Sequence, residues 1–222
     1  MTNVETSRSI RGTSAGGTPP DRAEGTAQAV AGILVMFSLL GISVVGNAIL
    51  SERIWHTVDR LRATPAAPAE LLAGKALPGL LVLLLQQATL LTFGVLALGL
   101  RVASPTLLAL VVATWAVTLL CCGAALATLA RSTAELAAAT DIGGVILTCF
   151  AGALVPLDAL PGWVRAVGPA SPGYWAMRGL HAAFGGDTGT VLRSLVPLVA
   201  VALGAGVLAG VRLARGWGRG GP

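Results

Sequence analysis

The sequence predicts an all-α, polytopic membrane protein with about five transmembrane helices, and three observations carry this prediction. Of its 222 residues 55% are hydrophobic and only 11% are charged, whereas about 25% of the residues of a soluble domain are charged. Four long runs contain no charged residue: 25–51, 76–100, 102–130 and 194–211. These runs are continuously apolar instead of alternating, so they fit membrane helices and not the strands of a barrel.

The runs divide the chain into expected segments. We expect spans at 26–50, 76–100, 106–130, from about 136 onward, and at 190–211, which together form a transmembrane domain over residues 26–211. The uncharged part of the fourth span, 142–157, is short for a full crossing, so a broken or partly re-entrant segment is expected there. Residues 1–25, rich in Thr, Ser, Gly and Pro, are expected to be a disordered tail without a signal peptide, and 212–222 to be a basic tail.

Charge and composition argue against a nucleic-acid partner and favour a membrane protein. The net charge is +5, but the basic residues lie at span ends and in loops, where lipid headgroups explain them, so no nucleic-acid partner is expected. The bilayer itself is the expected partner of the apolar surface. Lys75 is the sole lysine, and with the richness in Ala and Gly this suggests a GC-rich bacterial gene and a multi-pass protein of the bacterial cell membrane.

Neither a metal site nor a catalytic site is expected. Cys121, Cys122 and Cys149 lie inside apolar runs with no His or carboxylate nearby in the sequence, which favours small buried hydrophobic residues over metal ligands. His56 and His181 are expected on opposite sides of the membrane, so they cannot build a triad or a metal site together.

The loop after the first span contains the first informative pattern. Ile54, Val58 and Leu61 follow one another at i, i+4 and i+7, with charged residues on the other faces and Pro65 as a stop. This spacing predicts a short amphipathic helix along the membrane surface. A solvated helix that only connects two spans would give the same pattern.

The second informative segment runs over 152–163 and 169–175. Its repeated prolines break a helix, and its aromatic residues suit a membrane interface, where the ring is apolar and its polar atom stays wet. We interpret the segment as a gate or cap at the outer face, with an ordinary loop anchored at the interface as the alternative. The expected gate residues are Pro156, Pro161, Trp163, Pro172, Tyr174 and Trp175.

At these two segments the chain resembles the permease subunit of type-2 ATP-binding-cassette (ABC) exporters. The resemblance rests on Glu52-Arg53, Thr57, Leu61, Thr64-Pro65 and Gly74-Lys75, and on the placement of prolines and Trp163 in the second segment. It covers about residues 31–183. His56 stands where the family usually has glycine. The family has six spans, and the first span of this chain matches the family's second. Three explanations are open: the recorded start lies too far downstream, another chain supplies the missing span, or this is a reduced paralogue.

The resemblance implies a mechanism and a set of partners. The loop after the first span would be cytoplasmic, and its helix would dock on a separate ABC ATPase subunit. This chain would bind no cofactor, since Gly74-Lys75 is followed by Ala76 and lacks the rest of a phosphate-binding loop, so the partner would use the ATP. The permease would work as a homodimer or heterodimer and export a lipid-like, drug-like or polymer substrate. The expected coupling residues are Glu52, Arg53, Ile54, Trp55, Val58, Asp59, Arg60, Leu61 and Arg62.

A few polar residues within the spans leave alternatives open. Asn47, Gln86 and Gln87 could line a substrate path, although such residues more often form hydrogen bonds between helices. Asp141 is a candidate for ion coupling. A secondary transporter would need matched broken repeats, a membrane enzyme would need clustered catalytic residues, and a structural subunit without transport of its own is the remaining alternative.

Overall fold

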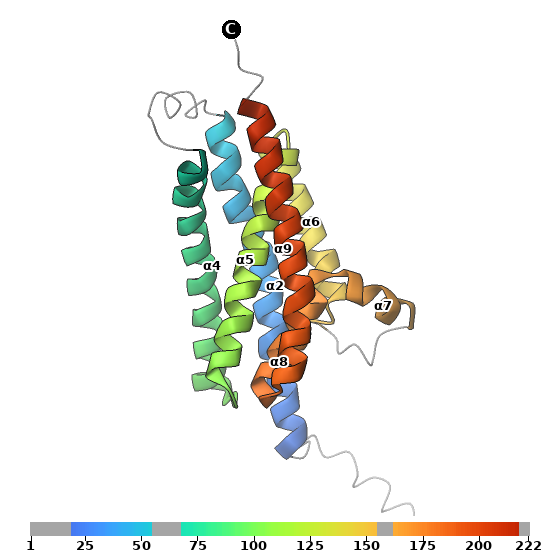
Figure 1. Ribbon diagram of the computed structural model, residues 1–222. Helices are drawn as coiled ribbons and strands as arrows, with labels where there is room; N and C mark the ends of the chain where they lie inside the picture. The colour runs from blue at the N-terminus through green and yellow to red at the C-terminus, as the bar shows by residue number, and fades with distance from the viewer. Residues whose placement is uncertain (1–18, 55–67, 155–161, 218–222) are drawn as a thin grey trace, which may run out of the picture.

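The computed structural model describes residues 19–54, 68–154 and 162–217, and within these ranges it contains helices and no strand. The all-α prediction is therefore confirmed. Five of the helices are long and apolar enough to cross a membrane, as the sequence predicts. The elements, labelled in Figure 1, are α2 (Pro19–Ile54), α4 (Pro68–Leu98), α5 (Pro105–Leu129), α6 (Thr133–Phe150), α7 (Gly162–Val167), the 3-10 helix η3 (Gly168–Ala170), α8 (Pro172–Gly185) and α9 (Thr188–Trp217).

The long helices run side by side and define two ends of the molecule (Figure 1). We call the end that holds Pro19, the α4–α5 turn and the α8–α9 turn the lower end, and the opposite one the upper end. Helix α2 runs from the lower to the upper end, α4 runs back to the lower end, and α5 returns to the upper end, where the chain turns into α6. It then reaches the lower end through α7 and α8 and climbs again along α9, so the first and last described residues lie at opposite ends.

Local sequence signals fix the boundaries of α5 and α6. Ser104 caps α5, where it accepts a hydrogen bond from the Leu107 amide, and Pro105 occupies the first turn, where no amide proton is needed. Ser132 caps α6 by accepting from the Glu135 amide at 3.1 Å, while Glu135 in turn accepts from the Arg131 amide at 2.9 Å. These caps explain why the span predicted at 106–130 agrees with α5 to within one residue at each end.

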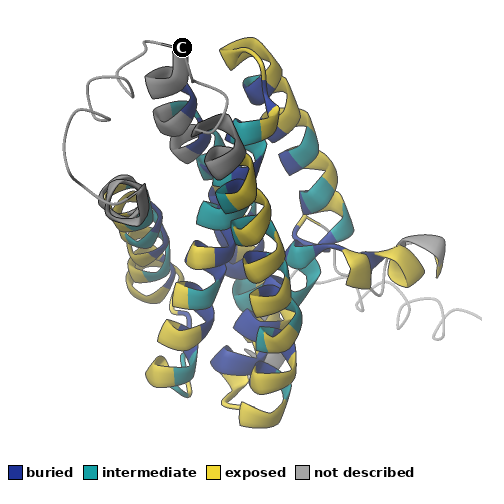
Figure 2. Cartoon of the chain, turned by 45° about the horizontal axis from the view of Figure 1, so that its top comes forward, coloured by how far each residue is buried: buried dark blue, intermediate teal, exposed yellow. Residues whose placement is uncertain are grey.

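Buried residues lie on the inner faces of the helices, and exposed residues lie on the outside of the bundle (Figure 2). Trp115, Leu34 and Leu198 are almost completely buried. On α4, by contrast, Leu85 is 70% exposed and Leu96 is 80% exposed. A soluble protein would hide such side chains, so their exposure around the bundle fits a surface that faces lipid.

Several boundaries differ from the sequence prediction; helix α4, for example, begins at Pro68 instead of residue 76. Helix α2 begins at Pro19, so the last residues of the expected tail are helical, and α9 continues to Trp217 beyond the expected end at residue 211. The segment interpreted as a broken gate or cap, 152–163 and 169–175, overlaps α7, η3 and the start of α8. The polar residues near Pro19 and the prolines near α8 concealed these helices, because charge and proline both argue against a membrane helix.

Candidate functional site

The fourth span breaks at Gly152. Helix α6 ends at Phe150, and Gly152 adopts a left-handed conformation with φ of +71°. The Ala153 amide donates to the carbonyl of Thr148, and the Gly152 amide donates to that of Cys149, a pairing that closes the C-terminus of a helix. The predicted break is confirmed, but it comes before Pro156, at a glycine whose positive φ ends the helix without any proline.

The broken backbone is shielded by helix α2. The side-chain nitrogen of Gln28 donates to the carbonyl oxygen of Gly152 at 2.7 Å. A methyl group on Gly32 would overlap the carbonyl of Ala153, so the absence of a side chain there lets the two backbones touch. Ala151, Gly152 and Ala153 are all buried. Non-helical backbone within a membrane is tolerated where protein covers it, and α2 supplies that cover.

Helix α8 continues the path of the fourth span toward the lower end, displaced sideways from α6 (Figure 1). It packs against α9, α5 and α2, so it belongs to the bundle and is not a surface loop. Gly173 allows close approach to Ala151, and Gly179 allows close approach to Val111 and Ser194. Glycine, which otherwise weakens a helix, serves here to bring three helices together.

The predicted gate residues fall into two groups. Pro172 starts α8, and the rings of Tyr174 and Trp175 meet edge to face with centroids 5.2 Å apart. The Trp175 indole donates a hydrogen bond to the Pro169 carbonyl at 2.8 Å. The backbone of Trp163 lies in α7. Pro156 and Pro161 lie outside the described residues, and gating by this segment stays a prediction.

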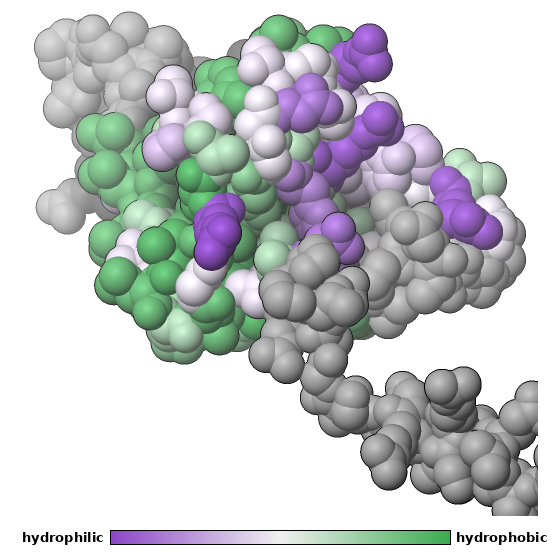
Figure 3. Space-filling view, turned by 90° about the horizontal axis from the view of Figure 1, so that it is seen from below, coloured by the Kyte–Doolittle hydropathy of each residue, from purple (hydrophilic) through white to green (hydrophobic). Residues whose placement is uncertain are grey.

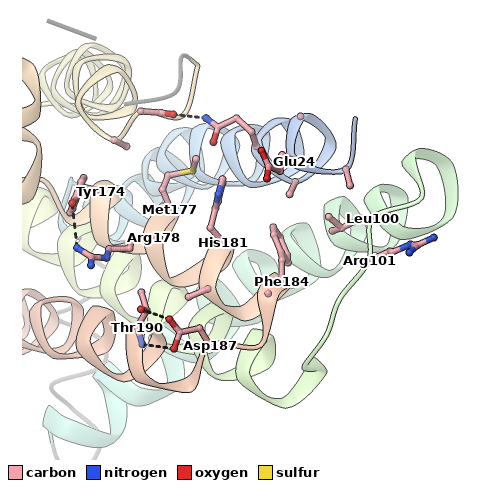
Figure 4. Close-up of a pocket in the computed structure, with 18 of the residues that line it drawn as sticks. Glu24, Leu100, Arg101, Tyr174, Met177, Arg178, His181, Phe184, Asp187 and Thr190 are labelled. Atoms are coloured by element: carbon pink, nitrogen blue, oxygen red, sulfur yellow. Dashed lines mark hydrogen bonds between the residues drawn. The ribbon is translucent and has the colours of Figure 1, made fainter. Parts of the chain in front are cut away.

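A pocket of about 1060 Å³ opens at the lower end. Its walls come from five places far apart in the sequence: residues 23–28 of α2, the turn 99–101, the break at 151–152, the face of α8 from 174 to 185, and 187–190 at the start of α9. Figure 4 shows its side chains, and Figure 3, seen from this end, shows hydrophilic groups gathered beside a hydrophobic region. The bundle therefore has a ligand-sized hollow at one end.

The ionisable groups of the pocket have different surroundings. Asp187 caps α9, because its carboxylate accepts hydrogen bonds from the amide and the hydroxyl of Thr190. These hydrogen bonds hold the pKa of Asp187 below its ordinary value. Arg178 reaches the Tyr174 hydroxyl at 3.5 Å, and its guanidinium lies 5.8 Å from the centre of the Trp175 ring. Glu24 on α2 and Arg101 in the α4–α5 turn also line the pocket.

Sequence reasoning did not find this pocket. Glu24 falls within the expected tail, residues 1–25, and no sequence pattern singles out Arg101 or Arg178. No spacing along the chain links them, since they meet only after the bundle has formed. One signal was available for α8: Pro172 at its start and Gly186 after its end are the residues that helices prefer at those positions.

The polar residues of the spans occupy different environments. The side-chain amide of Gln86 donates to the Phe37 carbonyl at 3.0 Å and so links α4 to α2. Gln86 therefore forms a hydrogen bond between helices, which was the alternative to lining a substrate path. Gln87 is completely buried, and its side-chain amide has no hydrogen-bond partner within the described part of the chain. Asn47 is half-buried, and Asp141 is exposed on α6. Within the described part of the chain no contact joins these residues into one path, and a substrate route along them stays a prediction.

The expected coupling residues lie at the upper end of α2 or beyond it. The backbone of Glu52, Arg53 and Ile54 forms the last turn of α2. Trp55, Val58, Asp59, Arg60, Leu61 and Arg62 lie outside the described residues. Among the residues the structure describes, no three His, Cys, Asp or Glu side chains come together as metal ligands would.

The fold and the break together define a polytopic helical membrane protein with an interrupted fourth span. A family model described as ABC-2 type transporter matches residues 8–184, which is most of the chain. The chain therefore belongs to the ABC-2 type transporter family, as the resemblance implied, and is a membrane component of transport. No curated protein matches it.

Proposed function

We propose that this chain is the permease subunit of an ATP-driven exporter that couples to a separate ABC ATPase. The observation that carries the proposal is the family match over residues 8–184, together with five membrane-crossing helices. The family acts in transport and normally works with an ABC ATPase. In this proposal the chain holds no nucleotide, and all ATP is bound by the partner subunit.

The geometry of α2 supports a coupling site at the upper end. Helix α2 runs from Pro19 to Ile54, and α4 starts at Pro68 at the same end of the bundle. The first residues of the coupling segment, 52–54, therefore form the last turn of a helix that runs along the whole bundle. On the helix that the sequence spacing predicts, Ile54, Val58 and Leu61 would face the ATPase groove, with charged neighbours setting complementarity.

The same proposal assigns an orientation and an assembly. The upper end would face the cytoplasm of a bacterial cell and the lower end, with the pocket, would face outward. Two permease chains would enclose the path of a lipid-like, drug-like or polymer substrate. Export, not import, is taken from the resemblance at residues 52–75 and 152–175.

The test is a pull-down of the tagged full-length chain from mildly solubilised native membranes. We expect an ABC ATPase to co-purify with the wild type and to be lost with the double variant Val58→Asp/Leu61→Asp, because two carboxylates would be buried against the groove. His56→Asp/Ala63→Asp is the matched control. It adds the same charges at positions seven apart, about half a helical turn away from the apolar face.

Three outcomes of the pull-down test the proposed coupling to an ATPase. Loss of the ATPase with the first variant and retention with the control supports both the permease role and the docking face. Equal loss with both variants points to unfolding of the segment and overturns the assignment of the face. Absence of any ATPase with the wild type contradicts the coupling, and a structural subunit or a secondary transporter then explains the chain better.

A further inference from the structure

Several charged groups line the lower pocket. Asp187 is engaged as the cap of α9, and Gln28 is engaged with the Gly152 carbonyl. Arg101 points away from the other side chains in Figure 4. Glu24 and Arg178 remain, and the structure gives neither of them an ion-pair partner within the described residues. Their charges are opposite, and both line the same hollow.

Arg178 forms the anion-binding side of the pocket. Its guanidinium is held over Trp175 and touches the Tyr174 hydroxyl, and the single contact at 3.5 Å leaves most of its five donors unused. A guanidinium beside a phenol hydroxyl matches the oxygens of a phosphate, which arginine binds through two parallel hydrogen bonds. The aromatic pair restricts the arginine side chain, so less freedom is lost when an anion binds.

Glu24 forms the cation-binding side. It precedes Gln28 by one turn and so lies on the same face of α2, the face that meets the break and α8. Figure 4 shows His181 between Glu24 on one side and Arg178 with Tyr174 on the other. The two charged groups thus lie on opposite sides of His181 and do not form an ion pair with each other.

Apolar side chains also line this hollow. Met177 and Phe184 are buried beneath the pocket, and Leu100 closes it from the α4–α5 turn. The pocket adjoins the ends of the candidate spans Leu77–Leu98 and Thr188–Arg212. A volume of about 1060 Å³ would hold a lipid headgroup with the first part of its chains, at the upper limit of ordinary ligand pockets.

From this arrangement we propose that the lower pocket binds the zwitterionic head of an amphiphile, with its phosphate on Arg178 and Tyr174 and its ammonium on Glu24. The two carboxylates and two guanidiniums of the lining cancel, so a purely anionic or purely cationic ligand gains no net attraction. A head that carries both charges satisfies both sides at once. A phospholipid or a soluble phosphoethanolamine ester could supply this head, and the apolar floor favours the phospholipid.

The test measures binding to the purified full-length chain in detergent, without ATP or ATPase. The probe is radiolabelled dihexanoyl phosphatidylethanolamine, and the competitors are dihexanoyl phosphatidylglycerol, which lacks the ammonium, and glycerophosphoethanolamine, which lacks the acyl chains. We expect that neither phosphatidylglycerol nor glycerophosphoethanolamine, at a concentration equal to that of the probe, displaces the bound probe from the chain. Glu24→Gln and Arg178→Gln should each weaken binding about tenfold or more, since each removes one charged contact.

Selectivity separates the two sides of the pocket. Glu24→Gln should remove the preference for phosphatidylethanolamine over phosphatidylglycerol, whereas Arg178→Gln should weaken the binding of both. Arg131→Gln, at an exposed position in the α5–α6 turn at the upper end, is the matched control and should bind as the wild type does. If Arg178→Gln does not fold, Tyr174→Phe keeps the ring packed on Trp175 and still removes one donor to the phosphate.

The proposal is overturned if the wild type does not discriminate between the two lipids, or if Glu24→Gln and the arginine or tyrosine variant bind as tightly as the wild type. Competition by glycerophosphoethanolamine as strong as that by the lipid would assign the site to a soluble ester. Because no ATPase is present, failure here would leave the proposed coupling untouched, and failure of the pull-down would leave this binding result intact.

Discussion

Gln28 donates a hydrogen bond from its side-chain nitrogen to the carbonyl oxygen of Gly152, 124 residues away and 2.7 Å distant. The bond satisfies a carbonyl that the end of α6 leaves without a helical partner. It joins the first described helix to the interruption of the fourth span. Several consequences of this contact and its neighbours can be measured.

Gln28→Leu should destabilise the protein by about 1–3 kcal/mol, because the buried carbonyl of Gly152 would lose its partner. The measurement is the free energy of unfolding in mixed micelles by titration with a denaturing detergent. Gln86→Leu is the control, since it removes a similar bond to Phe37 from an exposed position and should cost only about 0.6 kcal/mol. Equal costs for the two variants would contradict a special role for the break.

Gly32→Ala should lower the melting temperature, because its methyl group would overlap the backbone of Ala153 and force α2 away from the break. We expect a loss of about 1–3 kcal/mol, typical of overpacking. Gly204→Ala on α9 meets nothing within 4 Å and should be neutral or stabilising by up to about 1 kcal/mol. A Gly32→Ala variant as stable as Gly204→Ala would show that the close contact is dispensable.

Thr118→Val should weaken the contact between α5 and α9. The Thr118 hydroxyl lies 3.2 Å from the carbonyl of Leu198 on α9 and 2.8 Å from that of Thr114 in its own helix. We expect a cost near 0.6 kcal/mol, the average for hydrogen bonds between membrane helices. Thr114→Val removes only a bond within α5 and should cost less in the same unfolding titration. A larger effect at Thr114 would argue against this bridge.

Asp187→Asn should reduce thermal stability at neutral pH but not in acid. Hydrogen bonds from Thr190 lower the pKa of Asp187 in the folded state below its ordinary value of 3.8. The stabilisation is therefore fully present above the ordinary pKa and is lost as the pH falls through the lowered folded value. The melting temperatures of the wild type and of Asp187→Asn should differ at pH 7 and converge below pH 3.8. A constant difference at all pH values would exclude this origin.

The sequence predicts the membrane helices well, because a long apolar run bounded by a cap leaves few alternatives. Span 106–130 coincides closely with α5 for this reason. The start of α2 was missed, since hydropathy detects only the part of a helix within lipid and the first turns of α2 carry Asp21, Arg22 and Glu24. The helix nevertheless begins at Pro19, before these charged residues.

The details of the candidate site could be predicted only in part. The break in the fourth span follows from its short apolar run, but its position at Gly152 depends on a positive φ that the sequence does not reveal among so many glycines. The pocket depends on five separate segments meeting at one end. Proline at residue 172 suggested a break, whereas its place in the first turn makes it a helix start.

The contact of Gly32 with Ala153 has a mechanical consequence for α2. The 36 residues of this helix form a rod of about 54 Å, with about 20 Å below Gly32 and about 33 Å above it. Any tilt of the rod about this contact makes it a lever whose two arms swing in opposite directions. A displacement of about 5 Å at Ile54 would carry the lower tip by roughly 3 Å the other way. The wall of the pocket that holds Glu24 is the short arm of this lever, and the segment proposed to meet the ATPase is attached to its long arm.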